Sequence, residues 1–317
     1  MGAHDRPYEA TGKPGGSGEC PRPLMLAQQL FNALVLGSVY ALFSMGFTLT
    51  FGVLRVINLL YAFYVAAGAF LSLVAVRDFG VPLWAAGVFG AIGTGAIAVV
   101  CDTAVLAPLR RARAPELSSL IVTLGAALLL NSLMFLAFGA EVRRFPATLL
   151  SQAPIDLGVL QIGQIQLLII AVVALLAALL FLFIERTRLG VAIRALAENP
   201  EAAALMGINV GVMFAGVSFL AAVLIAIAGI LIGLNFDAVH PYMGEPLMLR
   251  GFAVVVIGGL GNIRGALVAG LALGFVEVMT AGYLSSNFKD AAGFAAMVIT
   301  LWLRPSGLFG KAVTRRA

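Results

Sequence analysis

Four ionisable residues lie inside or beside long apolar runs of this sequence, where charged side chains are uncommon. They are Arg55, Asp102, Arg250 and Glu277. Moving a charge into an apolar environment is costly, so such a side chain faces protein groups or water. Glu277 follows Gly270 by seven residues and Gly274 by three, which puts all three on one helix face of small residues. Glu277 is therefore predicted to point at protein, either in a buried ion pair or along a solute pathway.

A glycine cluster is the second candidate for chemistry. It reads Gly258-Gly259-Leu260-Gly261-Asn262. Transporters place substrate sites where membrane helices are broken, and glycines permit such breaks. Close packing of helices through small residues explains the same glycines equally well. Nothing in the chain matches GxxxxGK[ST], so no nucleotide phosphate loop is predicted.

The third candidate is the polar connection 185–210, which is too polar to cross a membrane. Its centre, residues 201–207, reads EAAALMG. This pattern predicts a short amphipathic helix that ends at Gly207. Such a helix at the membrane face is suited to docking another protein, although an ordinary interfacial helix has the same pattern.

Motifs of catalysis are missing from the sequence. There is no GxSxG, SxxK or HExxH, and with only two His residues in the chain no metal centre is expected. We therefore expect neither an enzyme nor a bound cofactor.

The composition is that of an integral membrane protein. Of 317 residues, 61% are apolar and only 11% are charged, whereas soluble domains are about 25% charged. This excludes a disordered chain and a disulfide-rich secreted module. The net charge of +5 is explained by basic cytoplasmic loops and not by a nucleic-acid partner.

Apolar runs of about 20 residues, the length a bilayer requires, recur along the chain. The six clearest cover residues 28–52, 58–76, 83–106, 117–138, 165–184 and 211–235. Beyond them, 249–303 is apolar but interrupted, and the run 250–261 would span only about 18 Å as a helix. The predicted fold is all-α: a polytopic transmembrane helix bundle with eight or nine spans, including a Gly-broken helix.

Basic residues set the predicted orientation. They cluster in two connections and at the carboxyl end: Arg110, Arg111 and Arg113; Arg186, Arg188 and Arg194; Lys311, Arg315 and Arg316. All three clusters should be cytoplasmic. The segment 139–164 then lies outside, where the alternation in IDLGVLQIG predicts a small hairpin. Asp102 and Arg55 are expected near membrane edges, reaching towards the interface.

The domain boundaries follow from these patterns. We predict a disordered amino-terminal leader at 1–24, since this stretch is rich in Gly, Pro and charge. Met25 opens a run typical of a protein start, so the leader is an extension or an upstream start. A transmembrane domain follows at 25–310, with the polar connection 185–210 within it. A basic cytoplasmic tail covers 311–317.

The chain resembles the LivH-type permeases of branched-chain amino acid ABC importers. The resemblance covers nearly everything after the leader, and its specificity lies in the order and spacing of short motifs. These motifs are Gln28–Asn32, Leu36–Leu42, Gly46, Ile57-Asn58, Ala107–Arg110, Arg194-Ala195, Glu198, Met206–Asn209, Pro241–Gly244, Gly258–Ile263, Gly265-Ala266, Gly274, Glu277 and Lys289-Asp290.

The resemblance implies a multi-pass protein of the bacterial inner (plasma) membrane with several partners. A periplasmic binding protein delivers the solute to a path between this chain and a second, LivM-like permease subunit. Two ABC ATPase subunits, LivG- and LivF-like, drive the cycle. They dock on the connection 185–210, which the resemblance implies is the cytoplasmic coupling loop of a transmembrane permease domain at 25–310. The implied ATPase-coupling residues are Arg194, Glu198, Glu201, Ala202, Ala203 and Gly207. Those expected near the path are Asn58, Tyr61, Gly258, Gly259, Gly261, Asn262 and Glu277.

One departure from the family pattern leaves the solute open. Where the family has His, Gly and an acidic residue, this chain has Tyr61, Ala62 and Phe63. Branched-chain amino acids are the expected solutes, with urea, amides and small or aromatic carboxylates as alternatives. The competing function is a stand-alone channel or ion-coupled secondary transporter, in which Asp102 and Glu277 would carry ions or protons.

Overall fold

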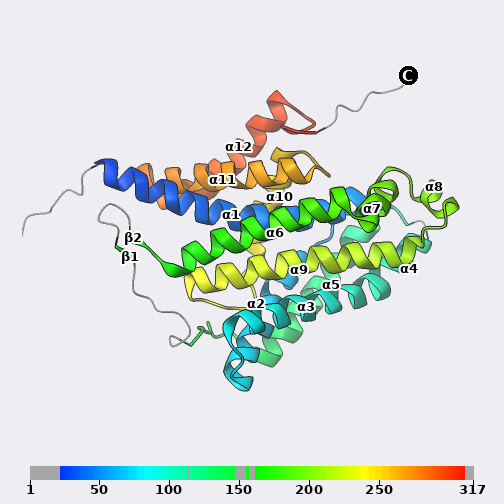
Figure 1. Cartoon of the computed structure of the whole chain (residues 1–317), viewed down its shortest axis with the longest axis horizontal. Coiled ribbons are helices and arrows are strands. Elements are labelled where there is room, and N and C mark those ends of the chain that lie inside the picture. Colours follow the sequence, from blue (N-terminus) through cyan, green and yellow to red (C-terminus); the bar gives the residue numbers. More distant parts are fainter. Residues whose placement is uncertain (1–21, 113, 147–154, 157–160, 311–317) are drawn as a thin grey trace, which may run out of the picture.

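The computed structural model describes residues 22–310 except 113, 147–154 and 157–160 (Figure 1). The leader predicted at 1–24 lies outside this range up to residue 21, as does the tail 311–317. Its helices are α1 (Arg22–Leu54), α2 (Tyr61–Phe79), α3 (Leu83–Cys101), η1, a π-helical turn (Asp102–Leu106), α4 (Ala107–Arg111), α5 (Glu116–Phe138), α6 (Gln164–Arg186), α7 (Arg188–Glu198), α8 (Pro200–Leu205), α9 (Val210–Phe236), α10 (Gly244–Gly258), α11 (Ile263–Tyr283), η3, a 3-10 turn (Ser286–Phe288), and α12 (Lys289–Leu303).

Apart from turns and loops, the described residues are helical except for one two-stranded hairpin and an isolated bridge between Arg143 and Val239. Strands β1 (Ile155–Asp156) and β2 (Gln161–Ile162) pair antiparallel, where the alternating pattern predicted a hairpin. Seven helices are long and apolar enough to cross a membrane. Helices α10 and α12, at 15 residues each, are shorter. A helical membrane bundle is therefore confirmed, whereas eight or nine spans are not.

The core of the bundle is formed by α1, α2 and α9. Their most apolar windows are 72–83% buried inside the protein, against 22% for α5 and α6. Helix α11 packs antiparallel on α1, because Gly270 lies on the backbone of Ala41 and Gly274 on that of Gly37. The small-residue face predicted around Gly270 and Gly274 is thus a helix-packing face.

The first residues of α2 and α10 pack against each other inside the bundle. A Cβ at Gly244, the first residue of α10, would collide with the carbonyl of Ala62 in α2, so only glycine fits there. Each helix follows a short non-helical stretch. Each stretch starts with a non-glycine residue in the left-handed region: Arg55 (φ 53°) directly after α1, and Asp237 (φ 47°) directly after α9.

One end of the bundle carries α4, α7 and α8, and the opposite end carries the β1–β2 hairpin (Figure 1). Arg110, Arg111, Arg188 and Arg194 belong to the first of these ends, which we call the arginine-rich end. An ion pair between Arg264 of α11 and Glu185 of α6 places the start of α11 there too. The positive-inside rule predicts that this end faces the cytoplasm.

The glycine cluster forms a turn between α10 and α11, in place of the expected break inside one helix. Gly259 (φ 97°) and Gly261 (φ 84°) adopt conformations that favour glycine. The turn lies at the arginine-rich end, where Gly261 faces Gly52 of α1. It receives the segment after α12, whose Leu308 N–H donates to the carbonyl of Ile257 (2.8 Å).

Candidate functional site

The projecting segment α7–α8 is built by polar caps at each helix end. The hydroxyl of Thr187 accepts from Gly190 N–H (3.0 Å) and starts α7. Asn199 ends α7 and starts α8, since its Oδ1 accepts from the N–H groups of Glu201 (3.0 Å) and Ala202 (3.1 Å). Gly207 (φ 85°) follows α8 in the left-handed region, as the sequence predicted. These caps fix the segment's shape without a partner.

The inner side of this segment anchors it to the bundle. Ile193 and Leu196 are buried, and their spacing of three residues gives α7 one apolar face; Ala203 is the buried residue of α8. The guanidinium of Arg55 donates to the carbonyl of Ala197 (3.1 Å), which ties α7 to the end of α1. Ala203, predicted as a coupling residue, thus lies on the anchored side.

The outer side of the segment is open. The other predicted coupling residues are exposed: Arg194, Glu198, Glu201, Ala202 and Gly207. Beside them, Leu205 and Met206 are 89% and 83% exposed, although both are apolar. Sequence reasoning did not single them out as docking residues, yet the signal was present as two large apolar residues between the alanines and Gly207. Two exposed apolar side chains beside polar ones are typical of a docking surface.

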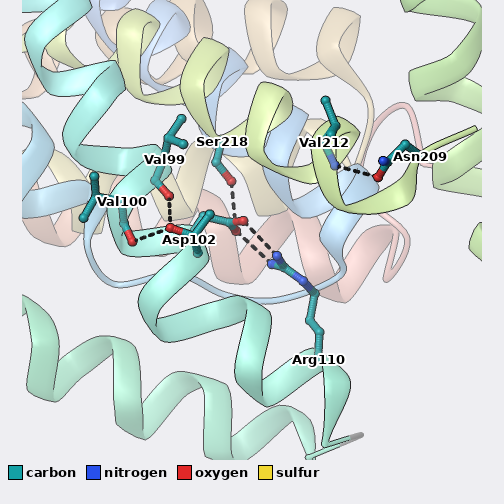
Figure 2. Close-up of polar contacts among 8 residues, drawn as sticks. Val99, Val100, Asp102, Arg110, Asn209, Val212 and Ser218 are labelled. Atoms are coloured by element: carbon teal, nitrogen blue, oxygen red, sulfur yellow. Dashed lines mark hydrogen bonds and ion pairs between the residues drawn. The ribbon is translucent and has the colours of Figure 1, made fainter.

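Next to this segment, a buried carboxylate joins α9 to η1 and α4. Asp102 is 2% exposed and accepts from both terminal nitrogens of Arg110 (2.8 Å each). The hydroxyl of Ser218 in α9 donates to the same carboxylate (3.2 Å), and Figure 2 shows the three side chains converging. The Arg110 guanidinium also lies over the ring of Phe214 (4.8 Å to the centroid). We call Asp102, Arg110 and Ser218 the Asp102 clasp.

The expectation that Asp102 reaches towards the membrane interface is therefore wrong. The π-helical turn at Asp102–Leu106 and the short α4 bring Arg110 back to the carboxylate. The hydroxyl of Thr103 donates to the carbonyls of Val99 (2.9 Å) and Val100 (3.0 Å), next to the turn. Buried charge is tolerated here because it is paired and hydrogen-bonded on both sides. Arg55, by contrast, is exposed at the helix end, as expected.

A second charged cluster joins four helices at the other predicted acidic residue. Glu277 of α11 is 2% exposed; it accepts from the Tyr40 hydroxyl of α1 (2.7 Å) and lies 3.3 Å from Nε of Arg250 in α10. Arg250 also contacts Asp290 at the start of α12 (2.5 Å). Buried pairing, one of the two possibilities for Glu277, is what the structure shows. The same geometry leaves Arg250 and Asp290 at the surface.

The predicted path residues do not form one site. Their nearest residues on α1 are Tyr40 for Glu277, Phe47 for Tyr61 (ring centroids 4.9 Å apart) and Gly52 for Gly261. Twelve residues of α1 separate the first from the last, which is about 18 Å. The path residues are thus spread along the bundle.

Each remaining path residue has a local structural role. Asn58 is buried, and its Oδ1 accepts from Leu60 N–H (3.0 Å) just before α2. Asn262 caps α11 through Gly265 N–H (3.1 Å), and its amide donates to the carbonyl of Phe309 (2.8 Å). Gly258 and Gly259 pack against the backbone of α11 and of the last described residues. Tyr61 is buried and packs edge-on against Phe47, and its hydroxyl has no hydrogen-bond partner among the described residues.

Metal chemistry finds no support in the part of the chain that the structure describes, since it contains no group of three or more His, Cys, Asp or Glu placed to hold an ion. The features above define the class of protein as a multi-pass helical membrane protein with one exposed, projecting segment, α7–α8.

Comparison with known sequences identifies the family. Residues 29–301 match the family described as branched-chain amino acid transport system, permease component. The chain is 31% identical to the high-affinity branched-chain amino acid transport system permease protein LivH of Escherichia coli, over 91% of this chain and 96% of that protein. It is 30% identical to BraD of Pseudomonas aeruginosa, a permease protein described in the same words, over 90% and 95%.

The chain therefore belongs to the branched-chain amino acid transport permease family. It is a transporter subunit and not an enzyme. Among solved structures, PsaBC from Streptococcus pneumoniae in complex with a Fab covers 90% of the chain at 12% identity and a TM-score of 0.49.

Proposed function

We propose that this chain and a second, LivM-like permease form the path through which an ABC importer moves branched-chain amino acids across a bacterial inner membrane. A periplasmic binding protein delivers the solute, and two LivG- and LivF-like ATPase subunits supply the energy. The names of the LivH and BraD relatives support the solute class. The arginine-rich end supports the orientation, with the docking segment inside.

The exposed outer side of α7–α8 is the observation that carries this proposal. A permease without a nucleotide loop must receive the energy of ATP from another protein. Leu205 and Met206 present an apolar tip, while Arg194, Glu198 and Glu201 lie exposed around it. Ala202 and Gly207 complete the exposed surface, and Ala203 holds it on the bundle. The tip inserts into a groove of the ATPase, and closure of the ATPase pair moves it.

The Asp102 clasp is placed to receive that movement. Helix α9 starts at Val210, three residues beyond Gly207, and carries Ser218 to the clasp. A shift of α8 therefore pulls on α9 and, through Asp102, on η1 and α4. Asn58, Tyr61, Glu277 and the glycine turn respond as packing elements of the moving helices.

We further propose nine crossings, the upper of the two expected counts. Beyond the seven long helices, α10 and α12 cross as shorter helices. Each is joined to a non-helical stretch, at 237–243 before α10 and 304–310 after α12, and these stretches cover the missing length. With nine crossings the amino end lies outside and the carboxyl end inside.

A double variant tests the docking role. In the reconstituted importer, Glu201→Arg with Gly207→Trp should abolish solute uptake and the stimulation of ATPase activity by the loaded binding protein, because charge reversal and bulk alter the docking surface. Membrane insertion should be unchanged. The matched control is Glu141→Arg with Gly87→Trp: Glu141 is exposed beyond α5, and nothing lies within 4 Å of a Cβ at Gly87. Normal uptake by the Glu201/Gly207 variant contradicts the proposal.

The competing function is a stand-alone channel or ion-coupled transporter. Both acidic residues that it would use are held by arginines, Asp102 by Arg110 and Glu277 by Arg250, which disfavours ion carriage. The chain alone, reconstituted in liposomes, separates the two functions. Solute flux without ATP and partner subunits would favour the channel, whereas flux that requires ATP, the ATPases and the second permease supports the importer.

A further inference from the structure

The ion pair between Arg250 and Asp290 is partly exposed on the face formed by α10, α11 and α12. A terminal nitrogen of Arg250 contacts Oδ1 of Asp290 at 2.5 Å, and the two side chains are 19% and 57% exposed. Behind this pair, Glu277 and Tyr40 hold the guanidinium from the buried side. The pair thus has a fixed inner half and an accessible outer half.

The depth of this pair excludes contact with lipid tails. Glu277 lies six residues before the end of α11, which is about 9 Å inside the membrane-crossing helix. Charged groups at such depth face protein or a water-filled path, since hydrocarbon offers them no partner. The α10–α11–α12 face therefore borders on polar surroundings in the assembled transporter.

A pair of opposite charges side by side matches a solute that carries both charges on adjacent atoms. We propose that Arg250 and Asp290 bind a zwitterionic α-amino acid as it passes between the two permease subunits, with its carboxylate on Arg250 and its ammonium group on Asp290. This inference rests on the proposed function, and it selects the zwitterion among the solute classes that the sequence leaves open.

Exchange of partners keeps every charge paired. When Asp290 turns to the ammonium group, Arg250 keeps Glu277 and uses its freed donors for the carboxylate. A buried charge without a partner is the main cost in such an environment, and this exchange avoids it. Neutral urea gains nothing from either charge, and a carboxylate without an amine leaves Asp290 unpaired beside it.

The surface beside the pair is apolar. A hollow next to it is lined by Ala253, Leu273 and Phe294, and Gly293, one turn after Asp290, adds no side chain to it. The hollow itself has a volume of about 10 Å³, enough for one water molecule. The aliphatic side chain of the solute would therefore lie over this apolar wall, between the two permease subunits, and not inside the hollow.

The test uses the permease–ATPase complex in nanodiscs. The binding protein is left out, so that its own preference among solutes does not determine the result. Thermal unfolding is followed with leucine, with 3-methylbutylamine or with 4-methylpentanoate. Leucine alone should raise the midpoint of the unmodified importer. Asp290→Asn should weaken the leucine effect about tenfold in concentration, the scale of one charge-assisted hydrogen bond, and Asp290→Glu should restore it. Asp290 is largely exposed, so neither variant disturbs the fold.

The matched control is Arg264→Gln, which removes another surface ion pair, with Glu185 at the arginine-rich end. It should respond to leucine as the unmodified importer does. An equal response of Asp290→Asn and the unmodified importer overturns the inference, as does equal stabilisation by all three compounds. Leucine-independent loss of stability in Asp290→Asn would show a contact with the second permease and also overturns it. Failure of the proposed function looks different, because the complete importer would then show no ATP-dependent leucine uptake.

Discussion

Asp102 and Arg110 form an ion pair in which each charge compensates the other. The carboxylate is 2% exposed, whereas the guanidinium is 20% exposed and reaches the surface of the bundle. Removing one charge of such a pair leaves the other without compensation in a poorly solvated place. Ser218 cannot replace the lost charge, since its hydroxyl supplies a single hydrogen bond.

We expect Asp102→Asn to lower the free energy of unfolding by about 3 kcal/mol. This is the lower end of the cost of breaking a buried ion pair, because the Arg110 guanidinium is still partly in contact with solvent. Thermal unfolding of the purified chain in detergent measures the loss. Arg111→Gln is the control, since Arg111 is exposed next to Arg110. An equal effect of both variants would show that the clasp contributes nothing to stability.

The charged residues could be found in the sequence, but their partners could not. An acid inside an apolar run signals a buried contact, which held for Glu277 and was missed for Asp102. The partner of Asp102 lies eight residues on and is reached only through a π-helical turn. Regular helical periodicity does not predict that turn. Arg250 and Asp290 are 40 residues apart, and only packing of α10 against α12 joins them.

The helix boundaries that the sequence predicted are those marked by local signals such as capping residues. Within the projecting segment, α8 is bounded by Asn199 and Gly207, and both boundaries follow from capping rules. The contact between the starts of α2 and α10 was not predicted, because it joins residues far apart in the chain. The glycine turn was predicted as a break, since glycines mark a bend without saying whether it interrupts a helix or joins two.

Packing of α11 on α1 gives a prediction at the scale of elements. A Cβ at Gly274 would collide with the backbone of Gly37, so Gly274→Val should push the two helices apart and cost roughly 1–3 kcal/mol. The control Gly125→Val makes the same exchange on α5, where a Cβ meets nothing within 4 Å. The two variants are compared by the fraction of each protein that remains monodisperse after heating. Comparable losses in the two variants would refute tight packing between α1 and α11.

The whole molecule is organised by two similar arrangements. In each, a long helix ends at a residue with positive φ, a non-helical stretch follows, and a second helix starts inside the bundle: α1 with α2, and α9 with α10. If α10 crosses as α2 does, the ends of α8 and α11 lie on opposite sides of the membrane. A topology in which α10 does not cross would place the same two ends on one side and would need α9 and α11 to run antiparallel, whereas both helices start at the arginine-rich end here.

Labelling of single cysteines distinguishes these two topologies. Leu205 and Leu284 are 89% and 76% exposed at the ends of α8 and α11, so cysteine at either position is accessible to a charged thiol reagent. Leu205→Cys should react only in inside-out vesicles and Leu284→Cys only in right-side-out vesicles. Cys101 is buried. Both variants carry Cys20→Ser, and vesicles with Cys20→Ser alone measure the background reaction. Reaction of both positions from the same side would remove α10 from the crossings, and with it the depth that places Arg250 inside the membrane.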